Sequence, residues 1–100
     1  MPDKRELARI FADIAVLLEL KGENPFKVRA YETAARILEE LDEDLESFVA
    51  SGRVDTTKGI GQALGQKIRE FVATGRLAYF EDLRAAVPAV LFELVRIPGL

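Results

Sequence analysis

Apolar residues recur every three or four positions along almost the whole chain, and this spacing limits the possible folds more than any other feature. The first run consists of Leu7, Ile10, Phe11, Ile14, Leu17 and Leu18. Such spacing places side chains on one face of an α-helix. Nowhere do more than a few residues alternate with the period of two that a half-buried strand requires. The sequence therefore predicts a compact all-α bundle without a sheet.

Local signals predict where the helices begin and end. Asn24 can cap free N–H groups and Pro25 fits a first helical turn, so a second helix starts there. Glycines after residues 21, 51 and 74 end helices. Four main helices are expected at about 4–20, 25–41, 42–50 and 62–74, with short C-terminal helices at about 77–83 and from residue 88.

Composition excludes several function classes. One hundred residues, 49% of them hydrophobic, fit a single globular domain over residues 1–100. The chain has no cysteine for disulfides or thiolate metal sites, and no histidine to act as metal ligand or general base, so zinc chemistry and triad hydrolysis are excluded. No apolar run is long enough for a bilayer span or a signal peptide. We expect a cytoplasmic protein without a membrane partner.

The net charge of −3 is unevenly distributed. Residues 1–52 hold seven basic and twelve acidic side chains, whereas residues 53–100 hold seven and five, so the halves carry −5 and +2. The basic residues of the stretch 53–76 are Arg53, Lys58, Lys67, Arg69 and Arg76. This stretch suits a polyanion, although a solvated helix face has the same composition.

The same stretch contains the glycine pair of Gly59-Ile60-Gly61. The first glycine allows a backbone turn that a side chain would forbid, and Ile60 can anchor the turn in the core. The second glycine opens the next helix without covering its N–H groups, which can bind a phosphate oxygen regardless of base sequence. A tight corner between two packed helices is an equally good interpretation of the glycines alone.

The wider segment KGIGQALGQKI resembles the helix-hairpin-helix motif. The matching residues are Gly59, Ile60, Gly61, Gly65 and Ile68, and Lys58 stands where that family often has proline. Together with NPFKVRAYETAARILEEL, KIREFVATGRL and VPAVLFELVRIPGL, it is similar to the N-terminal domain of family X DNA polymerases. The bacterial branch matches best, and the lyase domain of DNA polymerase beta is also similar.

The resemblance implies a four-helix domain that grips DNA at gaps, nicks or 5′-phosphate ends during base excision repair. In the family this domain is joined to a polymerase core and, in the bacterial branch, to a phosphoesterase domain. Residues 97–100 match the first half of a second hairpin, so we expect a domain excised from a larger protein. A designed or reconstructed sequence on the same scaffold would also fit.

The resemblance also assigns site residues. Lys67 matches the lysine that attacks the aldehyde of a 5′-deoxyribose phosphate to form a Schiff base. Lys27 and Tyr31, one helical turn apart, match the 5′-phosphate pocket. The DNA-binding hairpin comprises Lys58, Gly59, Ile60 and Gly61. The relatives bind Na⁺ or K⁺ through hairpin carbonyls, here those of Asp55, Thr57 and Ile60, and no other cofactor is implied. Three further basic residues of the relatives fall on Ala63, Ala78 and Tyr79.

Three functions are therefore compatible with the sequence. The first is a sequence-independent DNA-binding domain of a bacterial family X polymerase. The second is a helical protein-interaction or scaffold module, whose acidic first half is the working surface and whose hairpin is only a corner. The third is an autonomous lyase that uses Lys67. Polymerase chemistry does not belong to this chain, because nothing resembles a carboxylate cluster on strands for two metal ions.

Overall fold

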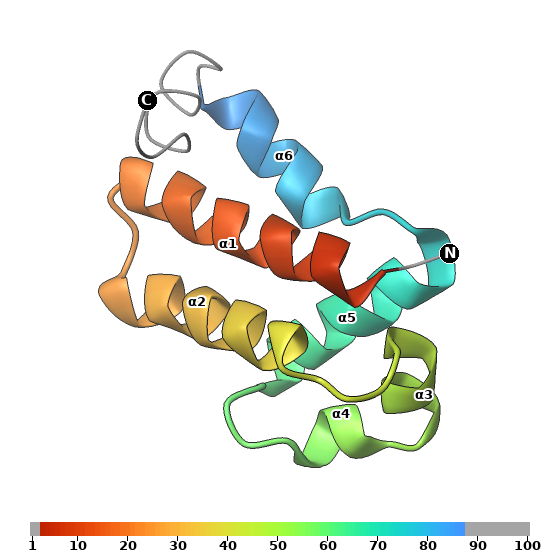
Figure 1. Cartoon of the computed structure of the whole chain (residues 1–100). Helices are drawn as coiled ribbons and strands as arrows, with labels where there is room; N and C mark the ends of the chain where they lie inside the picture. The colour runs from red at the N-terminus through yellow and green to blue at the C-terminus, as the bar shows by residue number, and fades with distance from the viewer. Residues whose placement is uncertain (1–2, 88–100) are drawn as a thin grey trace.

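The computed structural model describes residues 3–87, which form six α-helices and no strand (Figure 1). The helices are α1 Lys4–Leu20, α2 Pro25–Glu39, α3 Leu45–Ala50, α4 Arg53–Thr56, α5 Gln62–Thr74 and α6 Ala78–Ala86. The all-α prediction is confirmed. The single turn α4 was not expected from the sequence. The helix predicted from Pro88 and the half-hairpin at 97–100 lie outside the described residues.

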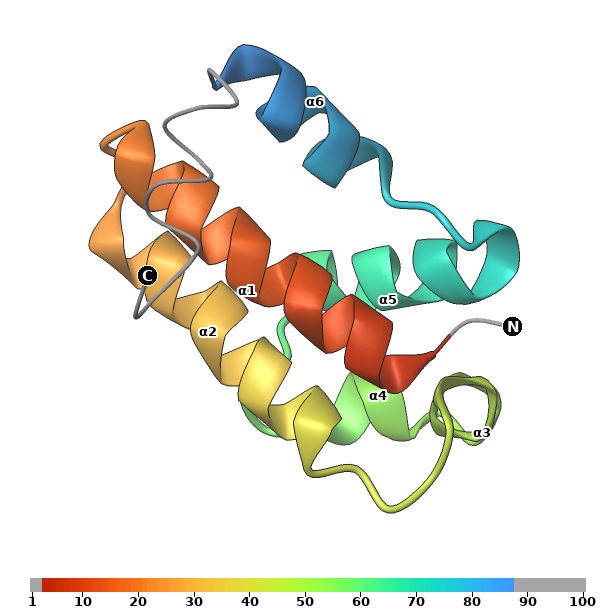
Figure 2. The same ribbon diagram turned by 45° about the horizontal axis from the view of Figure 1, so that its top comes forward.

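The two longest helices, α1 and α2, lie side by side and antiparallel (Figures 1 and 2). α6 packs against α1 on the side away from α2, and α3 contacts both α4 and α5. In residues 3–87 no helix is both long and apolar enough to cross a bilayer. The arrangement brings the beginning of α6 back toward α1 and α2.

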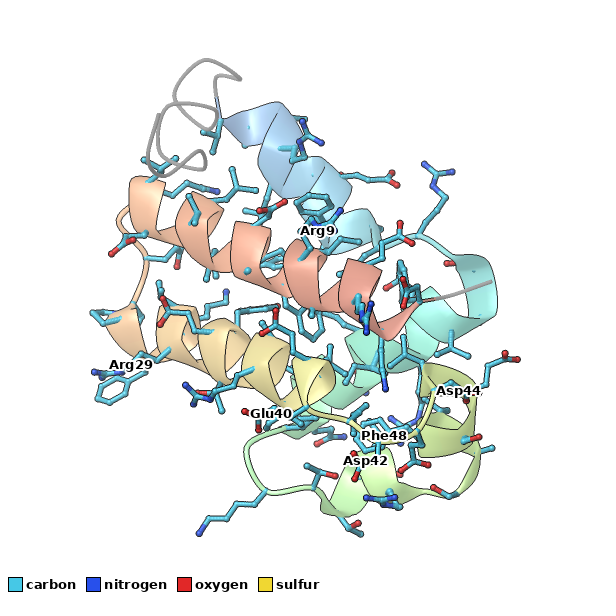
Figure 3. The ribbon with its side chains drawn as sticks, viewed as in Figure 1. Arg9, Arg29, Glu40, Asp42, Asp44 and Phe48 are labelled. Atoms are coloured by element: carbon cyan, nitrogen blue, oxygen red, sulfur yellow. The ribbon has the colours of Figure 1, made fainter. Side chains whose placement is uncertain are left out.

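One hydrophobic core joins the helices. Its largest fully buried side chains include Phe11 of α1, Phe48 of α3 and Phe71 of α5 (Phe48 is labelled in Figure 3). Burying a side chain of this size contributes about 1.5–3 kcal/mol relative to exposure. The apolar stripe that the spacing predicts for α1 is buried, except that Ile10 is only partly buried. The core therefore follows the sequence periodicity closely.

Polar side-chain caps begin the first three helices, α1, α2 and α3. The carboxylate of Asp3, the amide of Asn24 and the carboxylate of Asp44 each accept a hydrogen bond from a backbone N–H of the following turn. Lys4 Nζ donates to the carbonyls of Leu41 and Glu43, which ties the α2–α3 connection to the start of α1. Each cap satisfies N–H groups that a helix leaves without a partner.

Gly59 is required by backbone geometry. Its φ is +99°, and a Cβ there would lie 2.8 Å from Ile37 Cδ1 and 3.3 Å from Thr33 Cγ2. The Ile37 methyl can rotate away, so the left-handed backbone is the larger obstacle. We expect Gly59→Ala to lower the free energy of unfolding in urea by about 1–2 kcal/mol. Gly61→Ala should lose clearly less, because its φ is −79° and nothing lies within 4 Å of the added Cβ. Equal losses would contradict this.

The Asp44 cap makes stability depend on pH. Hydrogen bonds from the Ser47 backbone and hydroxyl, and then the Lys4 charge, hold the pKa of this carboxyl below its ordinary 3.8. Because its pKa is lower in the folded state, the ionised Asp44 carboxylate stabilises the fold at pH values above its pKa in the unfolded chain. This contribution disappears as the pH falls through the pKa of the folded state. The unfolding free energy of the parent minus that of Asp44→Asn should therefore shrink between about pH 6 and about pH 2.5. A constant difference would refute the coupling.

Candidate nucleic-acid interface

The hairpin between α4 and α5 is a tight backbone turn. The Ile60 N–H donates to the Thr57 carbonyl at 3.2 Å, with Gly59 at the third position in left-handed conformation, as in a type II turn. Ile60 is buried in the core, as expected, and Lys58 is exposed at the second position of the turn. The hairpin packs on α2 through the contact of Gly59 with Ile37. The turn therefore lies against α2, with Ile60 buried in the core.

The two hairpin glycines have different reasons to be glycine. The fold explains Gly59, which needs its positive φ. The fold does not explain Gly61, because its φ of −79° and ψ of 177° suit any residue and the space beside it is open. Because Gly61 has no side chain, the first backbone amides of α5 are accessible to a ligand. This accessibility is what the sequence predicts for a phosphate contact.

Among residues 3–87, no side chain caps the amides at the start of α5. Gly61 provides no side-chain cap, whereas α1, α2 and α3 are capped by Asp3, Asn24 and Asp44. At α6 the Glu70 carboxylate accepts a hydrogen bond from the Ala78 N–H at 3.0 Å. Among helices of residues 3–87 longer than one turn, α5 alone thus begins without a side-chain acceptor. Its free N–H groups and helix dipole favour an external anion.

Lys27 and Lys67 come together around one aromatic ring. Lys67 Nζ lies 4.7 Å and Lys27 Nζ lies 5.7 Å from the centre of the Tyr79 ring. These lysines belong to α2 and α5, and Tyr79 belongs to the first turn of α6. Both distances are within the range of a cation–π interaction. The structure therefore gathers the two lysines that the sequence assigned to phosphate binding and to nucleophilic attack.

Tyr31 completes this group from the interior. Its ring is stacked on Tyr79, with centroids 6.1 Å apart and 13° between the planes, and meets Phe11 edge-on at 5.4 Å. Burial, and to a smaller extent the neighbouring Tyr79, raise the pKa of the Tyr31 hydroxyl. The phenol therefore stays neutral at physiological pH and can donate a hydrogen bond. Tyr31 is both a residue of the core and a neighbour of the lysines.

Tyr79 is not predicted as a site residue from the sequence, where it stands only at a position that is basic in the relatives. The ring is held in place by the α5–α6 connection, where Arg76 donates to Glu81 at 2.9 and 2.7 Å. Two adjacent aromatics, Tyr79 and Phe80, begin α6, and both are partly buried. Spacing does not show which of the two faces the lysines. The sequence signal that could have indicated this residue is the aromatic pair Tyr79 and Phe80, which follows the helix-ending Gly75.

The basic stretch 53–76 is less positive than its composition suggests. Within residues 3–87, Arg53 pairs with Glu43, Arg69 with Asp55 and Arg76 with Glu81. Glu43 and Glu81 lie outside the stretch, so a local charge sum does not include them. Lys58 and Lys67 form no ion pair within the described residues. The positive charge available to a ligand is therefore carried mainly by lysines.

Acidic side chains gather at the other end of α2 from Lys27. Glu40, Asp42 and Asp44 lie in and beside the connection from α2 to α3 (Figure 3). Thirteen residues of helix separate Lys27 from Glu40, which corresponds to about 20 Å. This exceeds the screening length of about 10 Å at 0.1 M salt. The acidic end is therefore largely screened from Lys27, but it lies closer to the hairpin, which packs against Ile37.

The backbone carbonyls expected to hold a monovalent cation are only partly gathered. A hollow of about 300 Å³ is lined by Val54, Asp55, Ile60, Gly61 and Gln62. Thr57 is not part of this lining, and its carbonyl accepts the Ile60 N–H. No cluster of three acidic side chains that could hold a metal occurs in residues 3–87. Any cation here would depend on backbone oxygens.

A wider hollow of about 700 Å³ lies between α1 and α2, away from the lysine pair. Its lining is Arg5, Ala8, Arg9, Ala12, Glu32, Ala35, Arg36 and Glu39. Three arginines and two glutamates nearly balance, so this groove offers a phosphate little net attraction. The uncapped hairpin and the lysine pair remain the better candidates.

Comparison with known proteins supports the interpretation of the motif. Residues 2–77 match the family model of the helix-hairpin-helix domain. The DNA polymerase/3′-5′ exonuclease PolX of Bacillus subtilis (strain 168) is 37% identical over 97 residues, which are 97% of this chain and 16% of that protein. The resemblance to a family X polymerase is confirmed, and the chain spans about one sixth of that relative's length. By its motif, its helices and this match, the chain belongs to the helix-hairpin-helix domain family.

Proposed function

We propose that this domain binds DNA through phosphate groups, without reading base sequence, at gaps, nicks or 5′-phosphate ends. The observation that carries the proposal is the convergence of Lys27 and Lys67, from two different helices, within 5.7 Å of the centre of one ring. Two ammonium groups beside the same ring can both attract a doubly charged phosphate. The similar Bacillus protein is named as a DNA polymerase.

The hairpin contacts a second phosphate in this proposal. Lys67 follows Gly61 by six residues, so it lies about 9 Å along α5 from the helix start. The hairpin amides point along the helix axis, whereas Lys67 extends sideways toward α6. The hairpin therefore engages a backbone phosphate, and the lysine pair engages the terminal 5′-phosphate. Lys58, exposed at the turn, adds charge near the backbone contact.

We propose the same context as for the relatives: the N-terminal domain of a bacterial repair polymerase, acting in the cytoplasm in base excision repair. The partners within the parent chain would be a polymerase core and a phosphoesterase domain. The 37% identity over nearly the whole chain supports this placement. In such an enzyme the domain contributes grip and position at the DNA end, while other domains carry out synthesis.

A residual lyase activity is part of the proposal. The neutral Lys67 amine would attack the aldehyde carbon of a 5′-deoxyribose phosphate and release water, which leaves a Schiff base. Loss of a proton from the adjacent carbon then expels the 3′ oxygen in a β-elimination. Lys67 and Lys27 both lie over the Tyr79 ring, so a phosphate held by Lys27 would bring the sugar toward the attacking nitrogen. Ala63 supplies no additional cation, so we expect slow turnover.

We also propose that Na⁺ or K⁺ binds at the hairpin through the carbonyls of Asp55, Thr57 and Ile60. Asp55 and Ile60 border the hollow of about 300 Å³. Such an ion would add positive charge beside the uncapped amides of α5. It would strengthen phosphate binding without any side-chain ligand.

Covering the hairpin amides should weaken DNA binding. Gly61→Val adds a branched side chain in open space, so it should leave the fold intact while blocking the start of α5. Losing hydrogen bonds to a charged phosphate oxygen should reduce affinity for gapped DNA roughly tenfold or more. Fluorescence anisotropy over a range of salt should show little change in the log–log slope, because that slope counts phosphates neutralised by lysine and arginine and Gly61→Val removes no cation.

Ala73→Val provides the control for Gly61→Val. Ala73 is exposed near the far end of α5, so the variant adds bulk to the same helix away from the hairpin. It should bind like the parent. If Gly61→Val stays folded and binds equally well, the hairpin is only a structural corner, and the alternative of a protein-interaction module gains.

Borohydride trapping tests the role of Lys67. Reduction during incubation with a 5′-deoxyribose-phosphate end should give a covalent adduct with the parent domain, and Lys67→Ala should lose most of it. Lys27→Ala should weaken binding while leaving the trapped fraction at saturation nearly unchanged, because a clamp positions the substrate and does not attack it. Equal trapping by Lys67→Ala would assign the adduct to incidental amines.

A further inference from the structure

Tyr79 is the residue on which Lys27, Lys67 and Tyr31 converge, although neither the motif nor the assigned site includes it. Lys27 and Lys67 approach its ring from α2 and α5 at 5.7 and 4.7 Å, and Tyr31 stacks on it at 6.1 Å. Three helices that are separated in sequence thus meet at one side chain. Two ammonium groups repel each other, so a shared neighbour that attracts both has a specific effect on their placement.

We propose that Tyr79 is a positioning residue for the 5′-phosphate pocket, which holds the ammonium groups of Lys27 and Lys67 at one place before phosphate arrives. This inference rests on the proposed function. A lysine has four rotatable side-chain bonds, and ordering it on binding opposes association. The negative face of an aromatic ring attracts both cations, so part of that ordering is complete in the free protein.

The ring is itself well fixed, as a positioning residue must be. Tyr31 stacks on it and is in turn packed edge-on against Phe11 of the core. The helix that carries Tyr79 begins with the hydrogen bond from the Ala78 N–H to Glu70, and Arg76 with Glu81 closes the preceding turn. Tyr79 is only partly buried, so the lysines beside it remain accessible to a ligand. A rigid ring at an accessible site suits preorganisation.

The proposal depends on the ring and not on the hydroxyl group. The cations face the π system, so phenylalanine should serve at this position, whereas leucine keeps apolar volume and removes the π system. A role limited to packing α6 onto the bundle would be satisfied by leucine nearly as well. Tyr79→Phe and Tyr79→Leu therefore separate positioning from packing.

Phe80→Leu is a matched control. Phe80 is the next residue of α6, is also partly buried, and has the Arg84 guanidinium 5.7 Å from its ring centre. The substitution removes an aromatic ring with a cation over it from the same helix turn, but away from the two lysines. Any general loss of α6 packing should affect both leucine variants.

The experiment compares two duplexes with a one-nucleotide gap, identical except for a 5′-phosphate or a 5′-hydroxyl at the gap. The ratio of their dissociation constants measures the phosphate pocket. NMR of the free proteins measures the ring-current displacement of the ε-CH₂ resonances of Lys27 and Lys67. The parent, Tyr79→Phe and Phe80→Leu should share the displaced resonances and the phosphate preference. In Tyr79→Leu the ring-current displacement of the lysine resonances should disappear, and the preference for the 5′-phosphate duplex should fall about three- to tenfold.

The outcomes distinguish this inference from the proposed function. If the parent does not bind either duplex, both proposals fail. If the parent prefers the 5′-phosphate and Tyr79→Leu keeps the full preference, the proposed function stands and the role of Tyr79 is overturned. Equal loss in Tyr79→Leu and Phe80→Leu would also overturn it, because the effect would then arise from packing.

Discussion

The left-handed turn at Gly59, packed against α2, is the constraint on which the site depends. Its φ of +99° and its contact with Ile37 determine where α5 begins and in which direction it runs. The uncapped amides of the hairpin lie at the start of α5, and Lys67 lies further along the same helix. The end of α5 leads through a short connection to α6 and Tyr79. One backbone turn thus helps to place the uncapped amides and Lys67 relative to each other.

The core stabilises the fold, whereas the candidate site has the features expected of a ligand-binding site. Large side chains such as Phe11, Phe48 and Phe71 are fully buried in the core, and α1, α2 and α3 begin with side-chain caps. The site departs from these rules, because α5 begins without a cap and two cations share one ring. Local departures from good folding rules are expected where a protein binds a ligand. A bound phosphate would satisfy the amides and neutralise the cations.

The fold was largely predictable from sequence, and the site only in part. The spacing of apolar residues determined the long helices, and the one-turn separation of Lys27 and Tyr31 placed them on one face. α4 has four residues, which is too short for a periodic signal. Pairing of Arg69 with Asp55, and the meeting of Tyr79 with both lysines, depend on how helices pack. No local pattern encodes such contacts between distant segments.

Mapping of backbone amide resonances during titration with a 5′-phosphorylated, gapped duplex tests phosphate binding most directly. We expect the largest shifts at the free amides of Gln62 and Ala63 and around Lys27 and Lys67. The affinity obtained from these shifts should fall as the salt concentration rises. Shifts concentrated instead on the acidic connection between α2 and α3, or no shifts at all, would contradict a DNA-binding role for the hairpin and the lysine pair.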